Sequence, residues 1–170
     1  ARSDGAATRA QMDEACHRGF PTPWNAFCHF SSLEKAFPQS RFFAGYLQGW
    51  KDLKKAHQVE AISGAFLFVR REAGEAVGWW DEDYFFYGED LQFCFDLHKR
   101  GYKIYFVPDV SILHYGGVAS GIKKQSREIT TADHERTKIM QGHRFDAMRI
   151  FFHKNYKDTY PFLLNWMVHR

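Results

Sequence analysis

The chain has 170 residues, 45% hydrophobic and 25% charged, which predicts one globular domain with its own core and excludes an intrinsically disordered protein. Its net charge of +3 is too small to indicate a nucleic-acid-binding protein, which usually carries a dense basic patch. No apolar run reaches 18 residues, so we expect no complete membrane span. Aromatic residues make up 18% of the chain. We expect them mainly in the core, with sugar stacking and membrane contact as the alternatives.

The three cysteines are widely spaced and form no CxxC pair: Cys16, Cys28 and Cys94. Such a set argues against a disulfide framework and fits a reducing compartment. We therefore expect a cytoplasmic protein. A peripheral position at the inner face of the membrane is compatible with this location. The first residues include no initiator methionine and no signal peptide, which indicates a piece of a longer protein.

The first third of the chain predicts two helices and a loop. Thr8–Arg18 has the pattern of a short helix. Thr22 followed by proline is a favourable helix start, and apolar residues then recur at helical spacing as far as Phe37. Residues 39–57 show no clear period, so we expect a long irregular loop there.

An apolar stretch and a short helix follow. Val59–Val69 predicts one or two strands interrupted at Ser63-Gly64, and Gly64 there allows either a bulge or the close approach of a ligand. Ala65–Val69 is apolar on both faces, as in a central strand of a covered sheet. Arg70–Val77 predicts a helix that ends at Gly78.

The second half predicts a further alternation of helices and strands. In chain order we expect a helix at Gly88–Arg100, strands at Tyr102–Val107 and Ser111–His114, a loop at 116–130, and a helix at Thr131–Tyr156. An apolar tail with aromatic ends follows. We therefore treat residues 1–170 as one domain in which residues 131–170 form a long C-terminal helix and the tail.

Two adjacent carboxylates, Glu89 and Asp90, fall in the first turn of a predicted helix. The unpaired N–H groups and the helix dipole favour carboxylates there for purely structural reasons. The alternative is that one of the two points into a cleft as a general base, a role in which an aspartate is readily ionised. Gly88 would then relieve crowding where a substrate approaches.

Three other features have both structural and functional readings. His114 ends a predicted strand before two glycines, and sites of α/β proteins gather at strand ends, although a structural histidine is the alternative. Asp81–Asp83 resembles a metal-binding DxD pair but lies in an aromatic segment, so we favour a turn. Trp79 and Trp80 either stack on a sugar or pack against the protein.

Several short motifs occur in a fixed order along the chain. They are Phe20–Trp24, Ile62–Glu72, Val77–Asp90, Gly101-Tyr102, Val107-Pro108, and His114 with the glycines after it. This ordered set, over roughly residues 18 to 155, resembles the family 2 glycosyltransferases, and among them the bacterial rhamnosyltransferase-like branch.

The resemblance implies an α/β protein, the C-terminal, acceptor-side portion of a GT-A fold, with a mixed sheet and flanking helices. It also implies inverting transfer from a nucleotide-sugar (dTDP-rhamnose-like or a UDP-sugar) to a glycan or lipid-linked acceptor in cell-envelope polysaccharide synthesis. Asp90 would be the catalytic base, with Glu89 beside it. His114 would assist a divalent cation, Mn²⁺ or Mg²⁺, whose principal ligands we expect outside this chain.

Taking the resemblance together with the residue chemistry, we expect six residues to bind substrate: Gly64, Ala65, Trp79, Trp80, Tyr87 and Gly88. The chain departs from the family where Gln92 replaces a frequent aspartate and where two tryptophans replace a common Gly-Phe. The resemblance implies that the nucleotide-binding half precedes this chain, so we expect the isolated chain to be inactive and to self-associate through an exposed sheet edge. The alternative function is a non-catalytic glycan-binding or subunit-assembly module.

Overall fold

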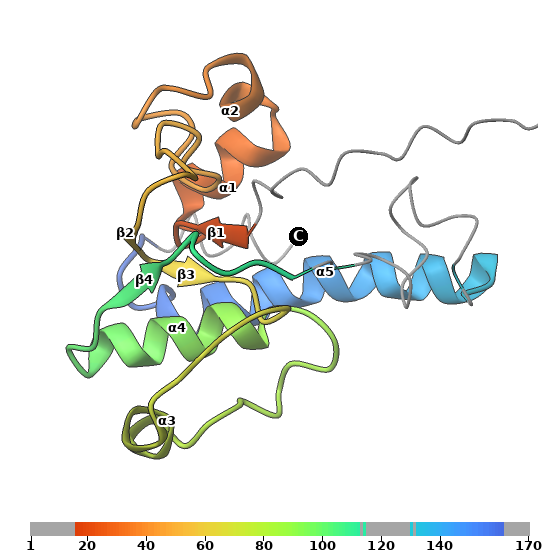
Figure 1. Cartoon of the computed structure of the whole chain (residues 1–170). Helices are drawn as coiled ribbons and strands as arrows, with labels where there is room; N and C mark the ends of the chain where they lie inside the picture. The colour runs from red at the N-terminus through yellow and green to blue at the C-terminus, as the bar shows by residue number, and fades with distance from the viewer. Residues whose placement is uncertain (1–15, 113, 115–129, 131, 162–170) are drawn as a thin grey trace, which may run out of the picture.

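The computed structural model describes residues 16–112, 114, 130 and 132–161 (Figure 1). The elements in these ranges are β1 (His17–Arg18), α1 (Pro23–Phe30), α2 (Leu33–Ala36), β2 (His57–Val59), β3 (Ala61–Ile62), α3 (Arg71–Val77), α4 (Glu89–Lys99), β4 (Ile104–Phe106) and α5 (His134–Asn155). This combination of helices and small sheets is consistent with the α/β class that we expected. Residues 116–129 of the predicted loop at 116–130 and the tail from 162 onward lie outside the described residues.

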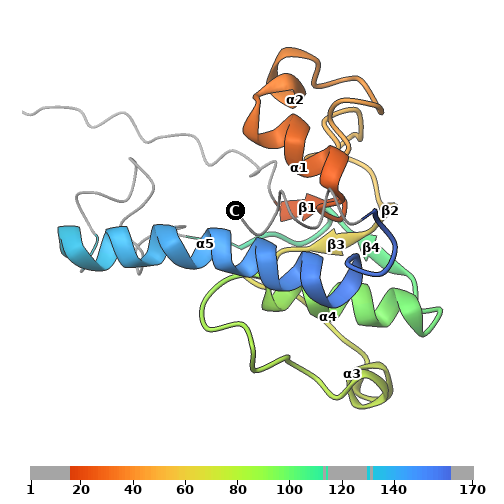
Figure 2. The same ribbon diagram turned by 180° about the vertical axis from the view of Figure 1, so that it is seen from behind.

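The strands form two short antiparallel pairs. Strand β1 pairs with β3, placing Arg18 opposite Ala61, and β2 pairs with β4, placing Val59 opposite Ile104. Within the described ranges the expected mixed sheet is therefore replaced by two two-stranded antiparallel sheets. Figures 1 and 2 show these strands between α1–α2 on one side and α4–α5 on the other.

The prediction of a central strand at Ala65–Val69 is wrong. The chain turns at this point, where the N–H of Phe66 donates to the carbonyl of Ser63 at 3.3 Å. Phe68 is 86% exposed, so this side chain has no covering layer. Because an apolar run becomes a strand only where another strand pairs with it, the run alone did not decide its conformation.

The N-terminal helices also differ from the prediction. The described end of Thr8–Arg18 is strand β1, not helix. Thr22 caps α1 as expected, since its hydroxyl accepts from the N–H of Asn25 at 3.2 Å. The predicted single helix to Phe37 is interrupted, because Ser32 has a left-handed backbone with φ of 63°. The chain then resumes as the short helix α2.

The three later helices confirm the predictions closely. Helix α3 ends at Gly78, α4 begins after Gly88, and both glycines have positive φ. Helix α5 begins three residues later than expected, where Asp133 accepts from the N–H of Arg136 at 2.7 Å. The strand expected at Tyr102–Val107 is the shorter β4, and residues 111, 112 and 114 belong to no strand.

Helix α4 lies at the centre of the core. Its buried residues are joined by side chains of the strands and of α5, namely Leu91, Phe93, Cys94 and Leu97 with Val59, Ala61, Ile104, Phe106, Ala147 and Phe151. Gln92, which stands where the family often has aspartate, links α4 to α5 by accepting from Asn155 Nδ2 at 2.7 Å. None of the described helices is both long enough and apolar enough to cross a membrane.

Candidate functional site

The Asp90 carboxylate is held by three separate parts of the chain. Its Oδ2 atom accepts from Arg18 Nη2 at 2.9 Å and from the N–H of Gly64 at 3.0 Å. Its Oδ1 atom accepts from the N–H of Leu91 at 2.8 Å. The side chain is 12% exposed. Strand β1, the turn after β3 and the start of α4 therefore fix one orientation of this carboxylate.

Arg18 is a residue of this site that the sequence did not indicate. Its side chain is 19% exposed and its Nη1 lies 3.4 Å from the Tyr46 hydroxyl, to which it donates. Burial lowers the pKa of Arg18, but Tyr46 and Asp90 more than offset this effect, so the pKa is raised overall. The guanidinium is therefore a permanent positive charge beside Asp90.

The hydrogen bonds of Asp90 leave room for one further donor. An ionised carboxylate offers about four acceptor positions. Among the described residues, three donors occupy them: Arg18, Gly64 and Leu91. Since the side chain remains partly exposed, a hydroxyl group can approach the remaining position. This arrangement is chemically able to orient a hydroxyl and accept its proton.

Glu89 lies in a different environment from Asp90. Burial raises the pKa of the Glu89 carboxyl, and the negative charge of Asp90 adds to this increase. The Glu89 Oε2 atom is buried without a hydrogen-bond partner among the described residues. The two adjacent carboxylates therefore differ, because Asp90 accepts three hydrogen bonds, whereas burial favours the protonated form of Glu89.

Gly64 and Ala65 lie in the turn that faces Asp90. A Cβ atom added at Gly64 would lie 3.3 Å from the Cβ of Asp90, so the absence of a side chain permits this close approach. Ala65 is exposed, and its N–H donates to the Ser63 hydroxyl at 3.4 Å. The structure thus brings Gly64 and Asp90 together, as expected for two residues of one site.

Gly88 and Tyr87 lie where the start of α4 meets α5. Gly88 has a φ of 93°, and a Cβ atom there would lie 2.8 Å from the Tyr84 ring and 3.1 Å from the Cβ of Ala147. These protein atoms occupy the space next to Gly88 where we expected a substrate to approach. Tyr87 is half-buried and contacts the Phe86 ring edge-on, with centroids 4.7 Å apart.

The two tryptophans pack over α3 and α4. The rings of Trp79 and Trp80 lie 6.4 Å and 4.7 Å from the Phe93 ring, centroid to centroid. A Cβ atom at Gly74 would lie 2.4 Å from the Trp79 ring, so α3 and this ring are in direct contact. The geometry therefore favours the packing interpretation of Trp79, although both rings remain partly exposed.

The described residues do not fit a divalent-cation site. The DxD-like segment is a turn, as we favoured, in which the N–H of Asp83 donates to Asp81 Oδ1 at 3.1 Å. Both aspartates pair with Lys154 at 2.5 Å, so its ammonium group occupies the position between them. His114 is exposed. No group of three or more His, Cys, Asp or Glu residues in the described ranges could hold a metal ion.

Comparisons with known proteins identify the family. Residues 14–169 match the family described as Glycosyl transferase family group 2. Two Mycobacterium tuberculosis proteins, from strains CDC 1551 / Oshkosh and ATCC 25618 / H37Rv, are each 36% identical over 83 residues, which is 49% of this chain and 26% of theirs. Both are named N-acetylglucosaminyl-diphospho-decaprenol L-rhamnosyltransferase.

A third relative is more distant. Rhamnosyltransferase WbbL of Escherichia coli strain K12 is 29% identical over 100 residues, which is 56% of this chain and 38% of that protein. The matches thus span about a quarter to two fifths of the curated relatives. No solved structure matches the chain significantly. Because the family match covers nearly the whole sequence, the chain belongs to glycosyl transferase family group 2 and is rhamnosyltransferase-like.

Proposed function

We propose that the protein containing this chain transfers a sugar, with inversion, from a nucleotide-sugar to a glycan or lipid-linked acceptor. The family match and the names of the rhamnosyltransferase relatives support this proposal. We extend to this protein a dTDP-rhamnose-like or UDP-sugar donor and a role in cell-envelope polysaccharide synthesis. This chain would supply the acceptor side and the catalytic base.

Asp90 is the base in this proposal. An acceptor hydroxyl would donate to the open position of the carboxylate and lose its proton there as its oxygen attacks the anomeric carbon of the donor sugar. The nucleoside diphosphate would leave from the opposite face. The observation that carries this assignment is the fixed Asp90 carboxylate, to which three described residues donate, Arg18, Gly64 and Leu91, so that within the described part of the chain one acceptor position is open. A prealigned base reduces the orientational cost of proton transfer.

Glu89 is the alternative base. Burial raises the pKa of its carboxyl, and a higher pKa brings a general base closer to neutral pH, where proton transfer is most efficient. Its buried Oε2 atom also has no partner among the described residues. Only substitution of each carboxylate in turn separates these two assignments.

The donor diphosphate calls for positive charge, which a divalent cation such as Mn²⁺ or Mg²⁺ supplies when bound. The resemblance to the family supports placing its principal ligands outside this chain, and the described residues contain no group of three or more that could hold the ion. His114 remains a candidate for an additional ligand. We further propose a cytoplasmic location at the inner membrane face, and self-association of the isolated chain, which a single monomeric mass in light scattering would contradict.

The experiment compares three carboxylates of α4 in the intact protein. Asp90→Asn should lower the transfer rate at least about hundredfold, because it removes proton acceptance while nearly keeping the shape of the side chain. Asp96→Asn is the matched control, since Asp96 lies on the same helix and, within the described residues, its carboxylate accepts from Gln92 Nε2 at 2.9 Å. Product formation from a labelled nucleotide-sugar is measured, and thermal unfolding checks that each variant is folded.

Glu89→Gln completes the comparison. Near-normal transfer by Asp90→Asn together with an inactive Glu89→Gln would move the base to Glu89. Near-normal transfer by both variants would refute a base in this part of α4. Activity lost equally in Asp96→Asn would indicate a general effect on the helix and not on the chemistry.

The Arg18–Asp90 ion pair also supports a second candidate, a non-catalytic glycan-binding or assembly module. In that case the pair acts only as a structural link between β1 and α4. Calorimetry of the intact protein with a nucleoside diphosphate and Mn²⁺ distinguishes the two, because a non-catalytic module has no need to bind the donor. Binding by the intact protein would argue against the module.

A further inference from the structure

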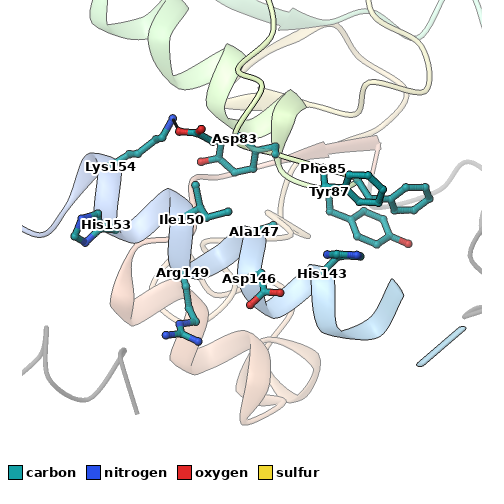
Figure 3. A pocket seen from close by; sticks show the side chains of 12 residues that line it. Asp83, Phe85, Tyr87, His143, Asp146, Ala147, Arg149, Ile150, His153 and Lys154 are labelled. Carbon is teal, nitrogen blue, oxygen red and sulfur yellow. Dashed lines mark ion pairs between the residues drawn. The ribbon is translucent and has the colours of Figure 1, made fainter. Parts of the chain in front are cut away.

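A cavity of about 690 Å³ lies between the segment that precedes α4 and the side of α5 (Figure 3). Phe85, Phe86 and Tyr87 provide one wall. Helix α5 provides the other, including His143, Asp146 and Arg149. Ligand sites of about 300–1,000 Å³ with aromatic walls and a few polar groups are typical for small molecules. The cavity is therefore a candidate binding site that the sequence did not indicate.

Phe85 is the most exposed aromatic ring of this cavity. It is 77% exposed and lies 5.0 Å from the His143 ring, centroid to centroid. Figure 3 shows Phe85 and Tyr87 beside His143 at one end of the cavity. Because little of the Phe85 ring is used in packing, its face is available to a ligand.

The polar groups of the cavity divide into paired and unpaired side chains. Lys154 is paired with Asp83 at 2.5 Å, so neither group is free for a ligand. Asp146 and Arg149 are exposed on α5, and within the described ranges no ion pair or side-chain hydrogen bond occupies them. A carboxylate and a guanidinium together offer both acceptors and donors to a ligand.

The charges of the cavity cancel. Asp83 and Asp146 contribute two negative charges, while Arg149 and Lys154 contribute two positive charges. A diphosphate would find no net positive charge here, and phosphate recognition depends on such an excess. A neutral ligand with hydroxyl groups and an apolar face matches these walls better.

We propose that this cavity binds a neutral pyranose unit of a glycan, with Phe85 stacking on the face of the sugar and Asp146 and Arg149 hydrogen-bonding its hydroxyl groups. The C–H groups on one face of a pyranose match an aromatic ring, and its hydroxyls need both donors and acceptors. The proposed sugar binding does not depend on whether the protein transfers a sugar. Identifying the bound sugar as part of the acceptor rests on the proposed function.

The position of the cavity agrees with an acceptor subsite. Ala147 lines the cavity and also lies against Gly88, where an added Cβ atom would be 3.1 Å from its own. Tyr87 and Asp90 are three positions apart in the sequence, so their Cα atoms are at most about 11 Å apart. One acceptor glycan can therefore occupy the cavity and extend toward Asp90.

The test measures sugar binding directly on the intact protein by saturation-transfer NMR. The probes are N,N′-diacetylchitobiose and maltose, with inorganic pyrophosphate as the competitor. Phe85→Ala and Arg149→Gln should each weaken binding of the recognised sugar about tenfold, since both side chains are exposed and their removal disturbs little packing. Phe68→Ala is the matched control, because Phe68 is 86% exposed and also contacts one ring, Phe66, at 5.2 Å.

Three results would overturn the inference. These are the absence of saturation transfer to both sugars, unchanged binding by Phe85→Ala, and displacement of the sugar by pyrophosphate. Asp96→Asn should bind the sugar as the wild type does, because Asp96 does not line the cavity. Failure of the proposed function would appear instead as retained transfer in Asp90→Asn, with sugar binding intact, so the two proposals fail in different ways.

Discussion

Replacing Gly88 with alanine tests whether this residue serves packing or a substrate. Gly88 precedes α4 with a φ of 93°, a left-handed conformation that side chains rarely adopt. The added methyl group would lie 2.8 Å from the Tyr84 ring and 3.1 Å from the Cβ of Ala147. Both contacts are shorter than ordinary van der Waals distances, so α5 or Tyr84 must shift.

The magnitude follows from two separate costs. The left-handed conformation costs an L-residue about 1–2 kcal/mol. Forcing an extra methyl group into a packed contact costs about 1–3 kcal/mol. Gly88→Ala should therefore lower the free energy of unfolding by about 2–5 kcal/mol, a large part of the 5–15 kcal/mol typical of a domain.

Gly78→Ala is the matched control. Gly78 ends α3 with a φ of 78°, and no atom lies within 4 Å of a Cβ placed there. This variant incurs only the conformational cost of about 1–2 kcal/mol. The difference between the two variants therefore isolates the packing of α4 against α5.

Urea unfolding, followed by tryptophan fluorescence and circular dichroism, measures both variants. Equal destabilisation by Gly88→Ala and Gly78→Ala would refute the packing argument. A Gly88→Ala protein with normal stability but reduced transfer would instead support the substrate-binding role that the sequence resemblance implied.

Two further predictions concern β1. Burial lowers the pKa of His17 to about 4 from its ordinary 6.5, with His57 and Lys51 adding to the effect. As the pH falls, the unfolded chain therefore binds a proton at this histidine before the folded protein does. The free energy of unfolding should fall by up to about 3 kcal/mol between pH 6.5 and pH 4. His17→Gln should remove this pH dependence, which unfolding measured at a series of pH values would show. Arg18→Met should lower the free energy of unfolding by about 3 kcal/mol, because it leaves Asp90 without an ionic partner. An unchanged melting temperature would show that the ion pair contributes nothing to stability.

Local sequence signals predicted the helices well. Gly78, Gly88 and the Thr22-Pro23 pair mark helix ends in the structure as they did in the sequence. Caps depend on hydrogen bonds and backbone angles within a few residues, so they can be read without the fold. Ser32 was the exception, because the residues around it gave no sequence signal for a left-handed backbone.

Strands were predicted less well for a physical reason. Ala65–Val69 has the composition of a buried strand, yet no ladder forms there among the described residues. His17–Arg18 was expected in a helix and pairs with Ala61–Ile62 instead. Strand pairing depends on partners that are distant in the sequence. Composition alone therefore indicates only that a segment can form a strand, not that a partner strand lies beside it.

The sequence by itself determined the family and the helix that begins at Glu89, and it predicted that Gly64 and Asp90 belong to one site. It could do so because ordered motifs and helix caps are local features of the chain. Only the tertiary structure placed Arg18 on Asp90, 72 residues away, and the aromatic segment before α4 against α5. Contacts of this kind form when distant segments meet in the folded core, which no local pattern specifies.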